Sequence, residues 1–401
     1  MWTVDQTDFS LLRGGGGRPF TAFVDALIRT HAFVQGIGEA EILTCLRTNV
    51  GDGGVDTQVR RSMDSDPTEY FRVPTCWQYK ATDTITDAEL RREIQKSYSS
   101  ELINKGYGYR FAICADAPAL KQAHWEEVLT AEARKIYAQA PEARVATASQ
   151  LASWTNQYPS LIPAFFRRDA GPTLFFEAWG QSITKATPTF VPVEAWRGDA
   201  LRIESHITLI QPVTGPVITL QGMAGVGKTR LVYEILSRLQ GASGLVVYTL
   251  DGDDAQEVAR YLANNPRTRG ILVADECPVE SRAGIIRILK GHTDRIRVVC
   301  IDNTGERLGD TGELWLNQLP SALVETVLEK NFQWVPPDRR RTYAAQSGGY
   351  IRLAADMCEH DTAIQIKGHL GPALDAVQDY YRQRLPEERQ RRAVEAVSLL
   401  Q

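Results

Sequence analysis

Two hydrophobic patterns alternate along the chain. Some segments place apolar residues three and four positions apart, as at positions 20, 23, 24, 27 and 28, and this spacing is typical of one buried helix face. Other segments are short apolar or alternating runs bounded by Gly or Pro, which predict strands. Helices are predicted at 20–28, 87–104, 119–140, 231–239, 254–264, 321–331 and 373–400. Strands are predicted at 55–59, 74–80, 107–115, 145–148, 216–221, 244–250, 271–274 and 296–301.

The order of these elements predicts an α/β protein in two parts. In the second part, strands alternate with helices, which is typical of a parallel sheet. The stretch from Thr187 to Pro192 holds two prolines within five residues and predicts a linker between the parts. We therefore expect an N-terminal α/β domain over residues 1–187, a linker over 188–200, a parallel-sheet core over 201–318 and a helical region over 319–401.

Composition narrows the class of protein and its compartment. The 401-residue chain has no apolar run long enough to span a bilayer and no N-terminal signal sequence, so we expect neither a membrane protein nor a secreted one. Its six cysteines form no C-x-x-C pair, which favours buried thiols in a reducing cytoplasm over disulfides or zinc. The net charge of −4 gives no overall attraction to nucleic acid, so any DNA contact must come from local basic patches.

One stretch in the second part carries a strong chemical signal. Residues 222–229 read Gly-Met-Ala-Gly-Val-Gly-Lys-Thr and match G-x-x-x-x-G-K-[ST], the phosphate-binding loop of P-loop NTPases. A predicted strand precedes this loop and a predicted helix follows it, as the motif requires. The glycines let backbone N–H groups point at phosphate oxygens. Lys228 would reach the β- and γ-phosphates, and the Thr229 hydroxyl would bind Mg²⁺.

A second signal follows in the same part of the chain. Four apolar residues precede Asp275 and Glu276, which is the form of a Walker B strand, and we assign Asp275 to the metal and Glu276 to activation of the attacking water. Asn303 either senses the γ-phosphate or forms a turn. The guanine-specifying N-K-x-D sequence does not occur, so ATP is favoured over GTP. We expect ATP to be bound by Gly222, Gly225, Gly227, Lys228, Thr229, Arg230 and Asn303, and Mg²⁺ by Thr229 and Asp275.

The N-terminal part carries a third arrangement of chemical groups. Asp56 follows a Gly-Gly turn on one predicted strand, and Gln78-Tyr79-Lys80 ends the next. If these strands pair, as consecutive strands usually do, the carboxylate and the ammonium converge on one site. A carboxylate with a neighbouring carbonyl can bind Mg²⁺, and Lys80 could orient a water or stabilise developing charge. The alternative is that Asp56 caps a turn and Lys80 is a solvated lysine at a strand end.

These residues resemble the PD-(D/E)xK nuclease superfamily in its Mrr-like branch, through Gly53-Gly54-Val55-Asp56 and Gln78-Tyr79-Lys80. The resemblance implies a restriction-endonuclease-like α/β domain over residues 1–187. It also implies Asp56, Gln78 and Lys80 as catalytic residues, with Asp56 and Gln78 at the metal. Many members carry a further acid on the first helix, for which Asp25 is the nearest candidate. Asp52 competes weakly with Asp56.

The helical region resembles that of STAND ATPases. Gly349-Tyr350-Ile351 aligns with their G-x-P signature, with isoleucine in the place of proline, and Arg352 is either a nucleotide-sensing arginine or a solvated one. An Mrr-like nuclease followed by a STAND-like ATPase is similar to the antiviral STAND (Avs) defence proteins of bacteria. That resemblance implies ATP-dependent homo-oligomerisation on sensing a phage component, after which the nuclease domains cut double-stranded DNA.

Several features leave alternatives open. STAND proteins usually carry a C-terminal sensor domain, so either this chain is a fragment or its sensor is a separate chain. The N-terminal domain is either an ATP-gated effector nuclease, part of a restriction-like enzyme that moves along DNA, or a non-catalytic interaction module. The clustered aromatic residues are more typical of a core than of a base-stacking surface; they are Phe165, Phe166, Phe175, Phe176 and Trp179.

Overall fold

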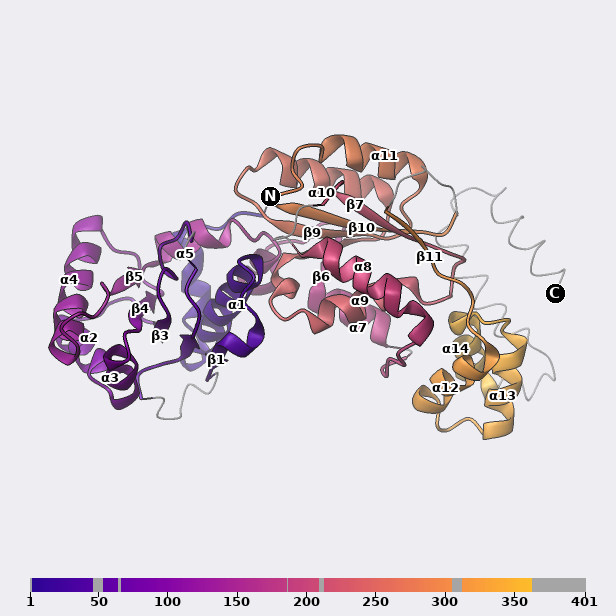
Figure 1. The fold of residues 1–401 in the computed structure, drawn as a ribbon, viewed down its shortest axis with the longest axis horizontal. Coiled ribbons are helices and arrows are strands. Elements are labelled where there is room, and N and C mark those ends of the chain that lie inside the picture. Colours follow the sequence, from indigo (N-terminus) through magenta and orange to yellow (C-terminus); the bar gives the residue numbers. More distant parts are fainter. Residues whose placement is uncertain are drawn as a thin grey trace.

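The computed structural model describes residues 2–45, 53–63, 66–185, 187–208, 213–304 and 312–362. These residues form two sheets, one in each half of the chain, with a small group of helices beyond the second sheet (Figure 1). Within the described ranges, no helix is both long and apolar enough to cross a bilayer.

The first sheet has five strands in the order β1-β2-β3-β4-β5. β1, β2 and β3 pair antiparallel, whereas β3, β4 and β5 pair parallel. The strands are Ile42–Thr44, Thr57–Val59, Thr75–Lys80, Gly108–Ile113 and Arg144–Ala146. Short 3-10 helices occupy Gln6–Leu12, Gly15–Gly17 and Glu39–Glu41. The α-helices are α1 (Arg18–Val34), α2 (Asp87–Ile94), α3 (Ser97–Asn104), α4 (Ala119–Ile136), α5 (Ala148–Thr155) and α6 (Leu161–Phe166).

Helices cover both faces of this sheet. α2, α3 and α4 pack on the outer face, while α1 and α5 lie on the face toward the second half of the chain (Figure 1). Alternate residues of a strand point to opposite faces of the sheet. The same strands therefore contribute side chains to two apolar cores, one on each face. Trp77 joins the core under α1, and Cys76 joins the one under α2 to α4.

The second sheet has six strands in the order β11-β7-β10-β9-β8-β6. All neighbours are parallel except β6, which runs antiparallel to β8. The strands are β6 (Thr173–Phe175), β7 (Val217–Gln221), β8 (Val246–Thr249), β9 (Gly270–Ala274), β10 (Ile296–Asp302) and β11 (Glu313–Trp315). Helices α10 (Gly252–Asn264) and α11 (Val279–Ile288) cover one face (Figure 1). The other face carries α7 (Phe176–Thr184), α8 (Arg197–Ile207) and α9 (Lys228–Arg238), with 3-10 helices η4 (Glu194–Trp196) and η5 (Ala242–Leu245).

Three helices pack together beyond the second sheet: α12 (Ser321–Asn331), α13 (Pro337–Gln346) and α14 (Ile351–Glu359). The bounds of α12 agree with the helix predicted at 321–331. The helix predicted at 373–400 lies outside the described residues.

The structure differs from the sequence analysis in how the two halves divide. β6 and α7 lie within the range predicted for the N-terminal domain, yet β6 pairs with β8 and α7 packs against α9. The predicted linker also contains η4 and the start of α8. Trp196, inside that linker, is 6% exposed because it is packed into the core. Residues 173–185 and 187–200 therefore belong structurally with the second sheet.

Two helices also differ locally from their predictions. The helix predicted at 87–104 is broken at Gln95 and Lys96 into α2 and α3. α10 begins at Gly252, two residues before the predicted start at 254, and its N-cap is Asp251. The Asp251 carboxylate accepts the backbone N–H groups of Asp253 and Asp254, which satisfies two of the free donors at a helix start.

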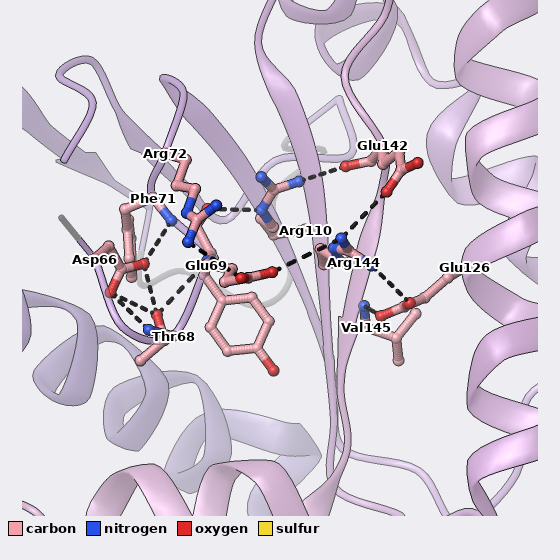
Figure 2. Close-up of polar contacts among 11 residues, drawn as sticks. Asp66, Thr68, Glu69, Phe71, Arg72, Arg110, Glu126, Glu142, Arg144 and Val145 are labelled. Atoms are coloured by element: carbon pink, nitrogen blue, oxygen red, sulfur yellow. Dashed lines mark hydrogen bonds and ion pairs between the residues drawn. The ribbon is translucent and has the colours of Figure 1, made fainter. Parts of the chain in front are cut away.

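The loop 66–72 is fastened to the first sheet by a polar network (Figure 2). The Asp66 carboxylate accepts hydrogen bonds from the Thr68 backbone and hydroxyl and from the Phe71 backbone N–H. Behind it, His31 Nε2 of α1 lies 3.0 Å from Asp66 Oδ1. On the other side, the buried Arg110 guanidinium donates to the Tyr70 and Glu142 carbonyls. Both ionisable groups are thus hydrogen-bonded, as burial requires.

We expect the free energy of unfolding to decrease as the pH falls from about 4 to about 2. Burial favours a raised pKa for Asp66, but the hydrogen bonds from His31, Thr68 and Phe71 outweigh it and lower the pKa from 3.8 to about 2. Because the pKa is lower in the folded chain, the ionised group stabilises the fold above pH 4. This contribution, about 2 kcal/mol, is lost as the pH falls through the folded pKa. Chemical denaturation across this pH range measures it.

Asp66→Asn serves as the control for this pH dependence. It removes the titrating group, so its unfolding free energy should be lower than that of the wild type at neutral pH and should vary less below pH 4. A variant with the full wild-type pH dependence would assign the effect to other carboxyl groups.

Candidate functional site

The phosphate-binding loop lies between β7 and α9, in the order predicted from the sequence. Three of its glycines have positive φ angles: Gly222 (148°), Gly225 (84°) and Gly227 (106°). A Cβ atom added at Gly222 would lie 2.5 Å from the Leu316 carbonyl oxygen, and one at Gly225 would lie 3.2 Å from Arg352 Cβ. Both conformation and space therefore demand glycine in this loop.

Lys228 is the first residue of α9 and is 4% exposed. Its Nζ donates to the carbonyls of Gly222 and Met223, at 2.8 Å each. Burial lowers the pKa of the ammonium to about 8, although the nearby Asp275, Asp302 and Glu276 carboxylates oppose this. The ammonium thus lies in the curl of the loop, bound to carbonyls with which phosphate oxygens would compete.

The Walker B acids meet the phosphate-binding loop at the carboxyl ends of the strands. Asp275 follows β9, and its Oδ2 accepts hydrogen bonds from the Thr229 and Tyr248 hydroxyls, each at 2.8 Å. Its Oδ1 accepts the Glu276 backbone N–H at 3.0 Å. Glu276 is half-buried and has a φ of 47°, a strained conformation that is common at functional sites. β10 separates β9 from β7, so the Walker B strand is not directly beside the loop strand.

The chemistry of these donors fits Mg²⁺. A threonine hydroxyl and an aspartate oxygen 2.8 Å apart are hard oxygen ligands, and Thr229 directly follows Lys228 at the start of α9. Mg²⁺ keeps several waters, so two protein oxygens with a nucleotide phosphate suffice to bind it.

A pocket of about 600 Å³ opens over this loop. Part of the lining comes from residues 182–185 and 187–196, including Lys185, Phe190 and Trp196, and another part comes from α14. Asn303 also lines the pocket, at the end of β10. Six of the seven residues predicted to bind the cofactor line this pocket: Gly225, Gly227, Lys228, Thr229, Arg230 and Asn303. The seventh, Gly222, does not line it, but its carbonyl accepts a hydrogen bond from Lys228.

The two predicted arginines have different surroundings in this pocket. Arg230 is bound to Glu234 and to the carbonyls of Thr187 and Pro188, so it fastens segment 187–188 to α9. Arg352 lies on α14, where its backbone N–H donates to the Gly225 carbonyl at 3.1 Å. Its guanidinium pairs with Asp356 at 3.1 Å and remains half-exposed. Arg352 therefore lies in the pocket wall rather than on a remote helix face.

The acid–lysine arrangement of the first sheet forms a second candidate site. β2 and β3 pair antiparallel, as the sequence analysis required. The Asp56 side chain is 7% exposed, and its Oδ2 accepts the Gln78 side-chain N–H and the Tyr79 backbone N–H, both at 2.7 Å. Gln78 is 3% exposed, and its Oε1 has no hydrogen-bond partner among the described residues. A buried acceptor left unpaired beside a carboxylate is suited to a cation or a proton donor.

Lys80 lies at the end of β3 with its ammonium 2.9 Å from Glu93 Oε1 on α2. Glu93 is not predictable from the sequence, because nothing in a charge-rich helix marks which acid faces a strand. Asp25 is held by other groups, since its oxygens accept the Arg29 guanidinium and the Thr44 hydroxyl. In the described ranges, no three His, Cys, Asp or Glu side chains cluster as a metal site. Asp52 lies outside those ranges.

The predicted aromatic cluster is largely core. Phe166, Phe175 and Trp179 are 2%, 8% and 0% exposed, so none of them offers a stacking surface to bases.

No protein-family model matches this sequence, and no curated protein matches it. Similar solved structures include a STAND protein with a tetratricopeptide repeat sensor from Pyrococcus horikoshii, at a TM-score of 0.30 and 13% identity. That match covers 42% of this chain and only 30% of the Pyrococcus protein. They also include the Aeropyrum pernix ORC1 protein in complex with DNA (TM-score 0.37, 17% identity, 51% of this chain and 70% of that one). C. elegans PCH-2 is a third (TM-score 0.33, 15% identity, 50% of this chain and 72% of that one).

The strand order, the glycine-lined loop and the hydrogen bond between Thr229 and Asp275 give the second half of the described chain the architecture of a P-loop NTPase.

Proposed function

We propose that this chain is an ATP-gated, Mg²⁺-dependent DNA endonuclease of the STAND type, acting as an effector in bacterial defence against phage. The observation that carries the proposal is the presence of two sites in the same chain. One is the phosphate-binding loop with Thr229 bound to Asp275, and the other is a buried site formed by Asp56 and Gln78, the acid–amide site. ATP binding would favour a homo-oligomer once a phage component, or a sensor domain or chain, acts as trigger. The oligomer would then cut double-stranded DNA.

At the nucleotide site, each residue has a role that its position supports. Lys228 would exchange its two loop carbonyls for phosphate oxygens. Glu276, exposed enough to meet a water beside the γ-phosphate, would accept the proton of the attacking water. Mg²⁺, held by Thr229 and Asp275, would neutralise charge on the phosphates. Asn303 and Arg352 line the same pocket and are placed to report which nucleotide is bound.

At the acid–amide site, Asp56 and the unpaired Gln78 Oε1 would hold a second Mg²⁺, which would polarise the scissile phosphate. Lys80 is 32% exposed in its side chain, so a phosphate group can compete with Glu93 for its ammonium. Once released from Glu93, Lys80 would stabilise the charge that develops on the phosphate oxygens.

Packing between the two halves of the chain supports control of the acid–amide site by the nucleotide site. One apolar core includes Leu27 of α1, Leu161 of α6 and Leu245 of η5, so it runs from the first sheet into the second. α1 also carries Asp25, which is hydrogen-bonded to Thr44, next to Thr57 of β2. A shift of η5 on nucleotide binding would therefore act on the helix that packs against the acid–amide site.

Plasmid cleavage with Mg²⁺ and ATP tests the proposal. Lys80→Ala is expected to reduce cleavage by at least about 100-fold, because one charge-stabilising group of this kind contributes roughly 3 kcal/mol to the transition state. ATP binding should stay at the wild-type level. Lys105→Ala is the matched control, since Lys105 also pairs with a glutamate, Glu101, but on the surface of α3. It should cut like the wild type.

A second function is favoured by one observation: the charges of the acid–amide site are already paired. Asp56 Oδ2 accepts two N–H groups, and Lys80 pairs with Glu93. On this basis the N-terminal half could be a non-catalytic interaction module whose assembly ATP controls. Cleavage that Lys80→Ala leaves unchanged, or its absence from the triggered wild-type protein, would favour the module over the nuclease.

A further inference from the structure

An aromatic side chain outside the predicted motifs contacts the metal-binding acid directly. Tyr248 lies on β8, is 3% exposed and lines the nucleotide pocket. Its hydroxyl donates to Asp275 Oδ2 at 2.8 Å, the same oxygen that accepts the Thr229 hydroxyl. The Glu276 backbone N–H occupies the other oxygen. The Tyr248 hydroxyl, the Thr229 hydroxyl and the Glu276 backbone N–H are thus three hydrogen-bond donors that fix the orientation of the Asp275 carboxylate.

The Tyr248 ring is itself held in place from behind. Trp179 of α7 stacks on it with ring centroids 4.7 Å apart and an angle of 16° between the planes. Trp179 is fully buried and makes an edge contact with Tyr233 of α9, at 5.3 Å and 89°. Aromatic rings stacked and wedged in this way cannot swing without opening the core. The position of the hydroxyl is therefore set by packing on α7 and α9.

We propose that Tyr248 is a positioning residue for metal binding by Asp275, with Trp179 as its support. The proposal rests on the proposed nucleotide site. When Thr229 turns its hydroxyl to the metal, Asp275 Oδ2 loses that donor, and the Tyr248 hydroxyl remains to hold the carboxylate in the orientation that binds. Partners of this kind, which orient a ligand without touching the metal, typically change metal affinity by 10- to 100-fold when they are removed.

The competing explanation is that Asp275 merely satisfies a buried hydroxyl. Under that explanation, Tyr248→Phe removes both the hydroxyl and its need for a partner, keeps the stacked ring, and leaves metal binding unchanged. The two explanations therefore differ in the coupling between metal and nucleotide, which can be measured without any turnover.

The test is the affinity of the whole protein for a fluorescent ADP analogue, measured in EDTA and in saturating Mg²⁺. The ratio of the two affinities reports how strongly the site couples metal to nucleotide. Tyr248→Phe should keep its affinity in EDTA within about twofold of the wild type, while the Mg²⁺ enhancement falls by about 10-fold or more. Tyr233→Phe makes the same change on the other side of Trp179, without a hydrogen bond to Asp275, and should match the wild type.

The outcomes separate this proposal from the one it rests on. An enhancement in Tyr248→Phe within about twofold of the wild type and of Tyr233→Phe would overturn the role of Tyr248. A wild-type protein that binds the analogue without any Mg²⁺ enhancement would overturn metal binding by Asp275, and the role of Tyr248 with it. A wild-type protein that binds no analogue in either condition would overturn the nucleotide site itself.

Discussion

Replacing Lys228 by alanine is expected to weaken ATP binding by at least about 100-fold and to abolish ATP hydrolysis. The ammonium makes two hydrogen bonds in the loop, and phosphate oxygens would take both of them. Charge-assisted hydrogen bonds contribute about 1.5–3 kcal/mol each, so losing two costs more than 2.7 kcal/mol, which corresponds to about 100-fold in affinity. Titration of a fluorescent ATP analogue measures binding, and phosphate release measures hydrolysis.

Unfolding does not account for this expected loss. The pKa of Lys228 is lowered to about 8 because burial disfavours its charged form, so at neutral pH the protein carries a buried cation at some cost to stability. Removing the ammonium should leave the melting temperature unchanged or raise it. Lys290→Ala, at an exposed lysine after α11, is the control and should bind ATP normally. Binding by Lys228→Ala within about fivefold of the wild type would place the phosphates elsewhere.

The phosphate site is predictable because its chemistry is local in sequence. The loop needs glycines, a lysine and a threonine at fixed spacing after a strand, and the structure has β7, the loop and α9 in that order. The Walker B acids are equally local, since a buried strand ends and two carboxylates follow. The strands predicted at 216–221, 271–274 and 296–301 are therefore close to the observed bounds of β7, β9 and β10.

The residues that contact these groups are distant in the sequence, so the sequence alone does not identify them. The order of strands along the chain does not show that β10 lies between β7 and β9 in the sheet. Parallel strands are joined by crossover connections, so strands that are consecutive in the sequence need not be neighbours. Tyr248 and Trp179 meet only because β6, a strand of three residues, pairs with β8 and brings α7 along. Glu93 meets Lys80 in the same way, across a helix and a strand.

The predicted division between the two halves differs from the observed packing for a related reason. Prolines mark a change in local conformation, and the proline-rich stretch 188–192 has no regular secondary structure. Domain membership instead depends on which core buries the apolar side chains. Residues 173–184, before the prolines, bury theirs on the second sheet. The α1–η5 contact extends one core across both halves, so within the described residues no single position separates two independent cores.

Replacing Gly244 by alanine is expected to destabilise the protein by about 2 kcal/mol, in the usual range for overpacking a close-packed contact. Gly244 lies in η5, where a Cβ atom would overlap Thr30 Oγ1 of α1 and lie 2.9 Å from Leu161 Cδ2 of α6. The Thr30 hydroxyl already donates to the Ala26 carbonyl, so it cannot turn away without losing that bond. The added methyl must separate α1 from η5. Urea denaturation measures the change.

Gly198→Ala provides the matched control, because a Cβ at Gly198 of α8 would meet nothing within 4 Å. In a helix, alanine is favoured over glycine by up to about 1 kcal/mol, so this variant should be as stable as the wild type or more so. Because the core is continuous, Gly244→Ala should lower the unfolding midpoint reported by probes in both halves together. A shift confined to one half would mean that α1 and η5 touch without sharing stability, and nucleotide binding would then have no route through this contact to Asp56 and Lys80.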